Sequence, residues 1–370
     1  MGINSIIGQH MFIGVSGHAL TPDEKKFIVQ NNIGGVVLFG RNVADPKQVR
    51  ELCAEIQSLR HTLPDKAPFF IGIDNEGGRV ARLKAPFTTW PPAKNLGDLD
   101  APTVSFHFAN RMGRELKAVG INLDFAPCVD VFTNPENKVI GDRSLSSDPE
   151  MVAKHASALV RGFIKADVLS CVKHFPGHGN TLLDSHFDLP VENLTLEQLE
   201  NRELIPFKKT FKSRVDMVMT AHIMFPEIDP EWPVTLSEKF IKGIIRDEYR
   251  YRGLVITDDL GMKALASNYG VDEIPVRALQ AGAELLLYCN EPDVPPQALE
   301  AILGAVAQGS LDQKNLEHSH QRILEVKKAK ITQPDPLSFE EVSKIVGHPE
   351  HLKISAAISK REMPEGLLSE

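Results

Sequence analysis

The sequence has few cysteines and no long apolar run, and both shortages limit what the protein can be. Its four cysteines lie far apart along 370 residues without paired spacing, a pattern typical of scattered core thiols in a reducing compartment. No stretch approaches the roughly 20 apolar residues that a membrane-spanning helix needs. No Lys or Arg precedes Lys25, and Gly8, Gln9 and His10 interrupt the first apolar segment, so we expect no secretory signal peptide. These features predict a cytoplasmic protein that does not act at a membrane.

An excess of basic residues is also missing. The formal net charge is −8, with 41 Lys and Arg against 49 Asp and Glu, whereas a nucleic-acid binder needs a basic stripe to neutralise phosphates. We therefore expect a small-molecule substrate and no nucleic-acid partner. Hydrophobic residues at 42% and charged residues at 24% are the composition of a soluble globular protein. The length suits one large barrel or two ordinary domains.

What the sequence does contain is a regular alternation of short apolar runs and amphipathic, helix-like segments. Near-continuous apolar runs suit strands that are buried on both faces of a parallel sheet. Eight such runs occur, at residues 10–15, 33–39, 69–74, 121–129, 168–174, 215–222, 253–258 and 283–289. Helix-like segments follow most of them, at residues 21–31, 46–61, 103–119, 149–166, 196–212 and 237–250. This count and the chain length predict an α/β fold, a single-domain (β/α)8 TIM-like barrel.

The alternative fold is a doubly wound open sheet, but the Gly-rich phosphate loop that would favour it after the first strand is missing. The two longest non-helical insertions, residues 75–101 and 130–148, follow the third and fourth strands. They therefore belong to the carboxyl-terminal face of the barrel, where sites are built. Beyond residue 331 the chain becomes polar and contains proline. We predict a catalytic barrel over residues 1–330 and a C-terminal extension over residues 331–370 that packs on the barrel or is partly disordered.

Charged and histidine residues gather where several strands end, on the face where barrels carry out chemistry. Asp258 follows the buried strand residues 254–256, and its neighbour Asp259 must point the other way because side chains alternate along a strand. One carboxylate therefore faces the barrel mouth, where it suits attack on an electrophilic sugar carbon and formation of a glycosyl-enzyme. A helix cap or a surface acid is the alternative role for Asp258.

Asp184 and His186 lie two residues apart in a loop that also contains Gly177 and Gly179. They can form a dyad in which the carboxylate orients the imidazole and raises its affinity for a proton, so that the imidazole serves as general acid and base. The two glycines would let the loop swing over a substrate. The alternative is a surface histidine without a catalytic role.

A third group of polar residues comes from the strand ends and the insertions that follow them. Together they form a ring of hydrogen-bond donors and acceptors that suits a neutral, hydroxyl-rich ligand. The members of this ring are Asp74, Arg82, Arg143, Lys173 and His174. Taken singly, each has an ordinary explanation as a cap or a salt-bridge partner.

These motifs closely resemble the family 3 glycoside hydrolases, in particular the bacterial β-N-acetylglucosaminidases that recycle cell-wall fragments. The resemblance covers roughly residues 5–330. Its most specific part is Lys173-His174-Phe175-Pro176-Gly177-His178-Gly179, followed by Asp184-Ser185-His186. Residues 74–80 and 141–144 are supporting matches. Two departures are Asn75, where His is commoner, and Gly261, where Ser is commoner.

The resemblance implies a retaining β-N-acetylglucosaminidase that needs no metal or cofactor. It implies that Asp258 is the nucleophile, that His186 is the acid/base and that Asp184 orients His186. It also implies a set of sugar-binding residues, namely Asp74, Arg82, Arg143, Lys173 and His174. Single-barrel members of the family act in the cytoplasm on N-acetylglucosaminyl-anhydromuramoyl peptides, so peptidoglycan recycling is the implied role.

Several other functions compete with this interpretation. A family 3 β-glucosidase and a phosphorolytic variant are the nearest alternatives. A metal-dependent hydrolase could use His174, His178, His186 and Asp184, although the first two fall in a Pro/Gly loop, so that their rings need not converge. A non-catalytic carbohydrate-binding barrel would bind a sugar without turnover. In a substrate-assisted hexosaminidase, adjacent acids such as Asp258 and Asp259 would polarise the N-acetyl group.

Overall fold

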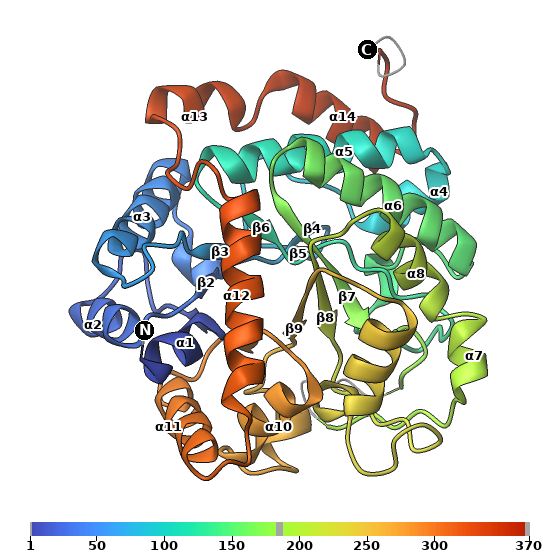
Figure 1. Ribbon diagram of the computed structural model, residues 1–370. Helices are drawn as coiled ribbons and strands as arrows, with labels where there is room; N and C mark the ends of the chain where they lie inside the picture. Colours follow the sequence, from blue (N-terminus) through green and yellow to red (C-terminus); the bar gives the residue numbers. More distant parts are fainter. Residues whose placement is uncertain (1, 183–187, 367–370) are drawn as a thin grey trace.

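The computed structural model describes residues 2–182 and 188–366 of the chain. Within them, eight parallel strands form one sheet in the order β10-β1-β2-β3-β6-β7-β8-β9. The strands are β1 (Met11–Gly14), β2 (Gly35–Leu38), β3 (Phe70–Ile73), β6 (Leu123–Asp124), β7 (Leu169–Phe175), β8 (Met217–Thr220), β9 (Leu254–Thr257) and β10 (Leu286–Tyr288). A parallel bridge between Ile256 of β9 and Leu285, just before β10, joins the two ends of the sheet. The prediction of a (β/α)8 TIM-like barrel is confirmed, and every strand overlaps its predicted apolar run (Figure 1).

Helices surround this sheet. Several begin where the sequence supplies a cap: Thr21 and Thr195 form capping boxes, and Asp148 accepts the backbone N–H of Glu150. The α-helices around the barrel are α1 (Ile3–Gln9), α2 (Pro22–Asn31), α3 (Pro46–Ser58), α5 (Pro102–Ala118), α6 (Pro149–Lys165), α7 (Leu196–Glu200), α8 (Leu204–Lys212), α9 (Lys263–Ala266), α10 (Glu273–Ala281), α11 (Val294–Ala307) and α12 (Gln313–Lys330). Short 3-10 turns are η1 (Gly40–Asn42), η2 (Leu59–Thr62), η3 (Gly141–Arg143) and η4 (Val234–Leu236), and η5 (Lys239–Glu248) is a π-helix.

One expectation about the insertion after the third strand is wrong. Residues 75–101 are not free of regular structure, because they contain the antiparallel ribbon of β4 (Asn75–Gly77) and β5 (Val80–Ala81) and the helix α4 (Ala93–Leu99). Gly77 and Gly78 turn the ribbon with φ angles of +97° and +57°, a backbone conformation that favours glycine. The strands of this ribbon are too short to show an alternating pattern in the sequence.

The core has two layers. One group of buried side chains fills the inside of the barrel, and a larger group lies between the strands and the surrounding helices. Helix α12 closes the amino-terminal end of the barrel: Lys327 donates to the carbonyl of Gly34, and Arg322 donates to that of Gly253, residues that precede β2 and β9. The opposite, carboxyl-terminal end is therefore the one left open for a site.

The last described residues form α13 (Phe339–Ile345) and α14 (Pro349–Ser359), which lie along α5 at the top of Figure 1. The buried carboxylate of Glu115 on α5 lies 2.7 Å from His351 Nδ1 and accepts the hydroxyl of Thr88 at 2.6 Å. This contact ties α14 both to the barrel wall and to the insertion after β3. Among the described residues, no helix is long and apolar enough to cross a membrane.

Candidate active site

A cavity of about 860 Å³ lies at the carboxyl-terminal ends of the barrel strands. It brings together six of the eight residues for which the sequence predicted a role: Asp74, Arg82, Arg143, Lys173, His174 and Asp258. The other two, Asp184 and His186, lie outside the described residues. Leu182, the last described residue before them, lines the cavity.

Asp258 follows β9 directly, and its backbone N–H donates to the carbonyl of Thr220 at the end of β8 (3.2 Å). Its Oδ1 accepts the N–H of Asp259 at 2.8 Å. The carboxylate of Asp259 is held differently, because its Oδ1 accepts the backbone N–H groups of Gly261 and Cys289. Burial raises the pKa of Asp259. Of the two adjacent acids, Asp259 therefore has its carboxylate hydrogen-bonded to backbone N–H groups, one of which belongs to Cys289 just after β10.

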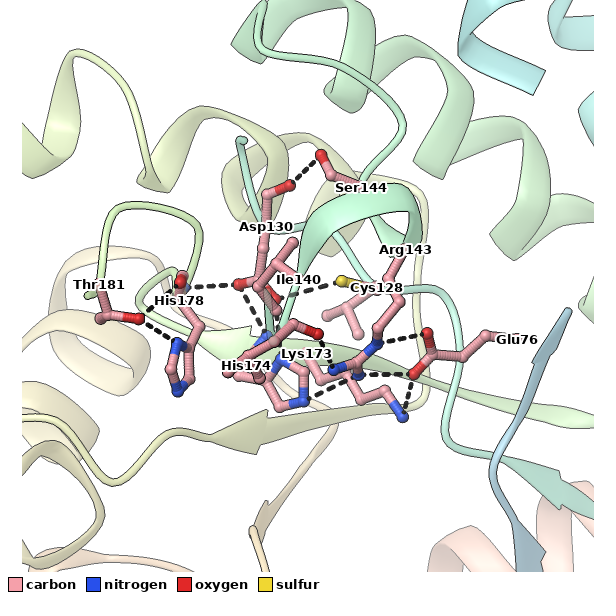
Figure 2. A network of polar contacts seen from close by, with 12 residues as sticks. Glu76, Cys128, Asp130, Ile140, Arg143, Ser144, Lys173, His174, His178 and Thr181 are labelled. Carbon is pink, nitrogen blue, oxygen red and sulfur yellow. Dashed lines mark hydrogen bonds and ion pairs between the residues drawn. The ribbon is translucent and has the colours of Figure 1, made fainter. Parts of the chain in front are cut away.

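A network of ion pairs joins the ends of β3 and β7 (Figure 2). Lys173 Nζ lies 2.7 Å from Asp74 Oδ1 and 2.7 Å from Glu76 Oε1. Arg143 donates two hydrogen bonds to Glu76, from Nε to Oε2 at 2.9 Å and from Nη2 to Oε1 at 2.8 Å. These two-pronged contacts fix the guanidinium plane as well as its charge.

The charges of this network support one another. Burial alone would raise the pKa of Glu76, but Arg143 and Lys173 outweigh it and hold that pKa well below its usual range. Burial alone would lower the pKa of Lys173, but Asp74 and Glu76 raise it above its usual range. Glu76 and Lys173 are therefore charged at neutral pH. The cations and carboxylates that line the cavity nearly cancel, which suits a neutral ligand.

His174 joins this network from the other side. Its Nε2 lies 3.3 Å from Arg143 Nη2, and its Nδ1 lies 2.7 Å from Asp130 Oδ2. His178 packs edge-on against it, with ring centroids 5.9 Å apart, and burial lowers the pKa of His178 to about 4. His178 Nδ1 contacts the hydroxyl of Thr181 at 2.6 Å (Figure 2).

Arg82 approaches the cavity from the strand β5 side. Its Nη2 lies 3.5 Å from Asp74 Oδ2, and its guanidinium stacks over the Phe39 ring at 5.5 Å. The Nε–H of Arg82 is buried and has no hydrogen-bond partner among the described residues. A buried donor without a partner costs free energy, so a ligand oxygen placed there would be favourable.

Three groups beside the cavity, Cys128, Asp130 and His174, are close enough together to suggest a metal site. Their chemistry does not fit one. Burial raises the pKa of the Cys128 thiol far above its usual range, and this thiol donates to Asp130; metal binding requires the thiolate. The rings of His174 and His178 stand at 77° to each other and hydrogen-bond to different partners. These residues form a hydrogen-bond network, and the other two ligands of the predicted metal site, Asp184 and His186, lie outside the described residues.

Sequence reasoning missed two members of the site, Glu76 and Asp130. Both are buried, with exposed fractions of 7% and 0%, and both contact residues that the sequence did identify. Each also follows the end of a predicted strand by a residue or two. An acid in that position was the available signal, since buried carboxylates need a partner.

Comparisons with known proteins give relatives of this chain in sequence and in structure. Residues 4–326 match the family model described as the glycosyl hydrolase family 3 N terminal domain. A beta-hexosaminidase of Nitrosomonas eutropha is 35% identical over 320 residues, which cover 83% of this chain and 89% of that protein.

Two solved structures show how far the likeness extends in space. A glycoside hydrolase family 3 beta-N-acetylglucosaminidase from Paenibacillus sp. matches with a TM-score of 0.89 at 36% identity, over 98% of this chain and 69% of that one. NagZ from Neisseria gonorrhoeae, solved in complex with N-trifluoroacetyl-D-glucosamine, matches with a TM-score of 0.78 at 30% identity, over 96% of this chain and 98% of that one.

Proposed function

The chain belongs to glycosyl hydrolase family 3 and is a glycoside hydrolase, and from this premise we propose that it is a retaining β-N-acetylglucosaminidase. In this proposal it removes terminal, non-reducing β-linked N-acetylglucosamine. The natural substrates we propose are N-acetylglucosaminyl-anhydromuramoyl peptides, in peptidoglycan recycling in the cytoplasm. The names of the relatives from Nitrosomonas eutropha and Paenibacillus sp. support the sugar specificity.

One observation carries the proposal. A single cavity is lined both by Asp258, at the end of a strand, and by a charge-balanced set of sugar-binding candidates built around Lys173 and Arg143. A neutral sugar would find both donors and acceptors there. The oxocarbenium-like transition state, which carries positive charge at the anomeric carbon, would be stabilised by the Asp258 carboxylate.

The proposed reaction has two steps. In the first, Asp258 attacks the anomeric carbon while the bond to the leaving oxygen breaks, and His186 donates a proton to that oxygen. In the second, His186 removes a proton from water, the water oxygen attacks the same carbon, and Asp258 leaves as a free carboxylate. Asp184 orients His186. The roles of His186 and Asp184 rest on their spacing in the sequence and on the family resemblance.

The test compares two chromogenic substrates that differ only at the second carbon, an N-acetyl-β-glucosaminide and a β-glucoside. We expect kcat/KM for the N-acetyl substrate to be higher by about tenfold or more, because a site that hydrogen-bonds an amide loses that contact with a hydroxyl. Equal values, or a preference for the glucoside, would replace the proposal with a β-glucosidase. Adding phosphate and looking for a glycosyl phosphate product tells water from phosphate as the acceptor.

A mechanism-based trap tests the retaining route. A 5-fluoro N-acetylglucosaminyl derivative should leave a covalent label on the peptide that contains Asp258. The matched control is Asp258→Asn, which should take up no label while its circular dichroism stays unchanged. A label on another peptide, or turnover with no label at all, would contradict the assignment.

A further inference from the structure

The carboxylate of Asp130 has an unusual number of donors around it. It lies six residues after β6, is completely buried, and each of its oxygens accepts two hydrogen bonds (Figure 2). Oδ1 accepts the backbone N–H groups of His174 (3.2 Å) and His178 (2.7 Å). Oδ2 takes the thiol of Cys128 (3.2 Å) and faces His174 Nδ1 (2.7 Å). Burial alone would raise the pKa of Asp130, but His174 and then His178 hold it well below its usual range.

The second ring nitrogen of His174 decides which tautomer this histidine adopts. Its Nε2 lies 3.3 Å from Arg143 Nη2, and a guanidinium has only donors. Nε2 must therefore carry the lone pair, since a proton there would face another proton. The imidazole proton then resides on Nδ1, where it is donated to Asp130. His174 thus turns its acceptor nitrogen toward Arg143 and the cavity.

We propose that Asp130 is a positioning residue that fixes His174 in the Nδ1–H tautomer, so that the lone pair of Nε2 accepts from Arg143 and holds this guanidinium in place beside the cavity for a ligand. The same carboxylate holds the backbone at both ends of residues 174–178. That short segment leads through Thr181 to the part of the chain that contains Asp184 and His186. Asp130 thus links His174 in the cavity lining to the backbone of His178. The inference rests on the proposed function only for the identity of the ligand.

The substitution Asp130→Asn separates tautomer control from simple filling of space. The amide side chain would have nearly the same shape as the carboxylate, and its oxygen would accept the two backbone N–H groups as Oδ1 does now. Its NH2 group would then face His174 Nδ1 and the Cys128 thiol. Because an amide NH2 cannot accept a hydrogen bond, Nδ1 would have to carry the lone pair and Nε2 the proton. That proton would oppose Arg143.

The experiment observes the tautomer directly. Nitrogen NMR of protein with ¹⁵N-labelled histidine, assigned with His174→Gln, should show a protonated Nδ1 and an unprotonated Nε2 in the unmodified protein at pH 7. Asp130→Asn should reverse the two signals and raise KM for the chromogenic substrate about tenfold or more, with a smaller change in kcat. The matched control is Cys128→Ala, which removes a donor from the same oxygen but keeps the negative charge. It should leave both the signals and KM unchanged.

Three results would overturn the inference: an Nε2-protonated or cationic His174 in the unmodified protein, an unchanged tautomer in Asp130→Asn, or a reversed tautomer in Cys128→Ala. A merely structural role for Asp130 would lower stability without reversing the signals. If Asp130→Asn does not fold, Asp130→Glu keeps the carboxylate and should keep the tautomer; reversal there would refute the proposal equally. Because the NMR measurement needs no turnover, its outcome is independent of whether the chain acts on N-acetylglucosaminides.

Discussion

Replacing Glu76 should be among the most damaging single changes in the site. Its side chain is only 4% exposed, and it contacts Arg143 and Lys173, which are 10% and 2% exposed. Lys173 keeps Asp74 when Glu76 is lost, whereas among the described residues Arg143 keeps hydrogen bonds only to the carbonyl of Val139 and the ring of His174. Glu76→Ala therefore leaves a buried guanidinium without a carboxylate.

The expected loss of stability in Glu76→Ala follows from the burial of the ion pair between Glu76 and Arg143. Removing one partner of a buried ion pair typically costs about 3–5 kcal/mol, whereas an exposed pair contributes about 0–1 kcal/mol. The chain supplies the matched control: Asp142 pairs with Arg79 at 3.2 Å, and their side chains are 45% and 47% exposed. Asp142→Asn should lower the free energy of unfolding by less than about 1 kcal/mol. Glu76→Gln keeps the shape of the side chain but not its charge. Its loss in the free energy of unfolding should lie between the losses of Asp142→Asn and Glu76→Ala.

The assay is urea unfolding followed by circular dichroism, together with kcat/KM on the chromogenic N-acetyl-β-glucosaminide. Glu76→Gln should lower kcat/KM at least tenfold, because Arg143 and Lys173 lose the group that orients them. If Glu76→Gln matches Asp142→Asn in stability and retains kcat/KM within about twofold, charge pairing does not organise this site and the reasoning fails.

Three more outcomes can be measured on the same protein. Asp258→Asn should lower kcat by about a thousandfold or more with the fold intact, and a milder effect than that of Asp259→Asn would reverse their assignment. His186→Ala should spare the first step for substrates with activated leaving groups, which need no proton, and slow natural aglycones far more; equal slowing would remove His186 as the acid. Because the folded-state pKa of Glu76 lies below its usual 4.5, its stabilisation is present above about pH 4.5 and is lost as the pH falls further. The melting temperature of Glu76→Gln should then depend less on pH between about 5 and 3 than that of the unmodified protein, and parallel curves would contradict this.

The barrel could be predicted because its strands are buried on both faces, which leaves a near-continuous apolar run in the sequence for each of them. The end of each run also marks where a side chain enters the open face, and this is why Lys173 and Asp258 could be placed there. The ribbon of β4 and β5 and the helix α4 were not predicted, because elements of two to seven residues carry too little periodicity.

Glu76 and Asp130 show a different limit of the sequence. Neither lies at a spacing that links it to its partners: Glu76 is 67 residues from Arg143, and Asp130 is 44 residues from His174. Their roles depend on which strand ends become neighbours and on the bend that β4 makes after Asp74. Those facts exist only once the sheet order β3-β6-β7 is known.

The pairing of β1 with β10 has a consequence for how the chain folds into an active enzyme. Met11 lies beside Leu286, so the seam of the barrel closes only after nearly the whole chain has been made, and such distant contacts form slowly. The cavity draws Asp74, Lys173 and Asp258 from three separate strand ends, so no fragment of the barrel contains a complete site. Partly folded chains will already display helical circular dichroism while remaining inert, and recovery of sugar cleavage during refolding will report on closure of the seam.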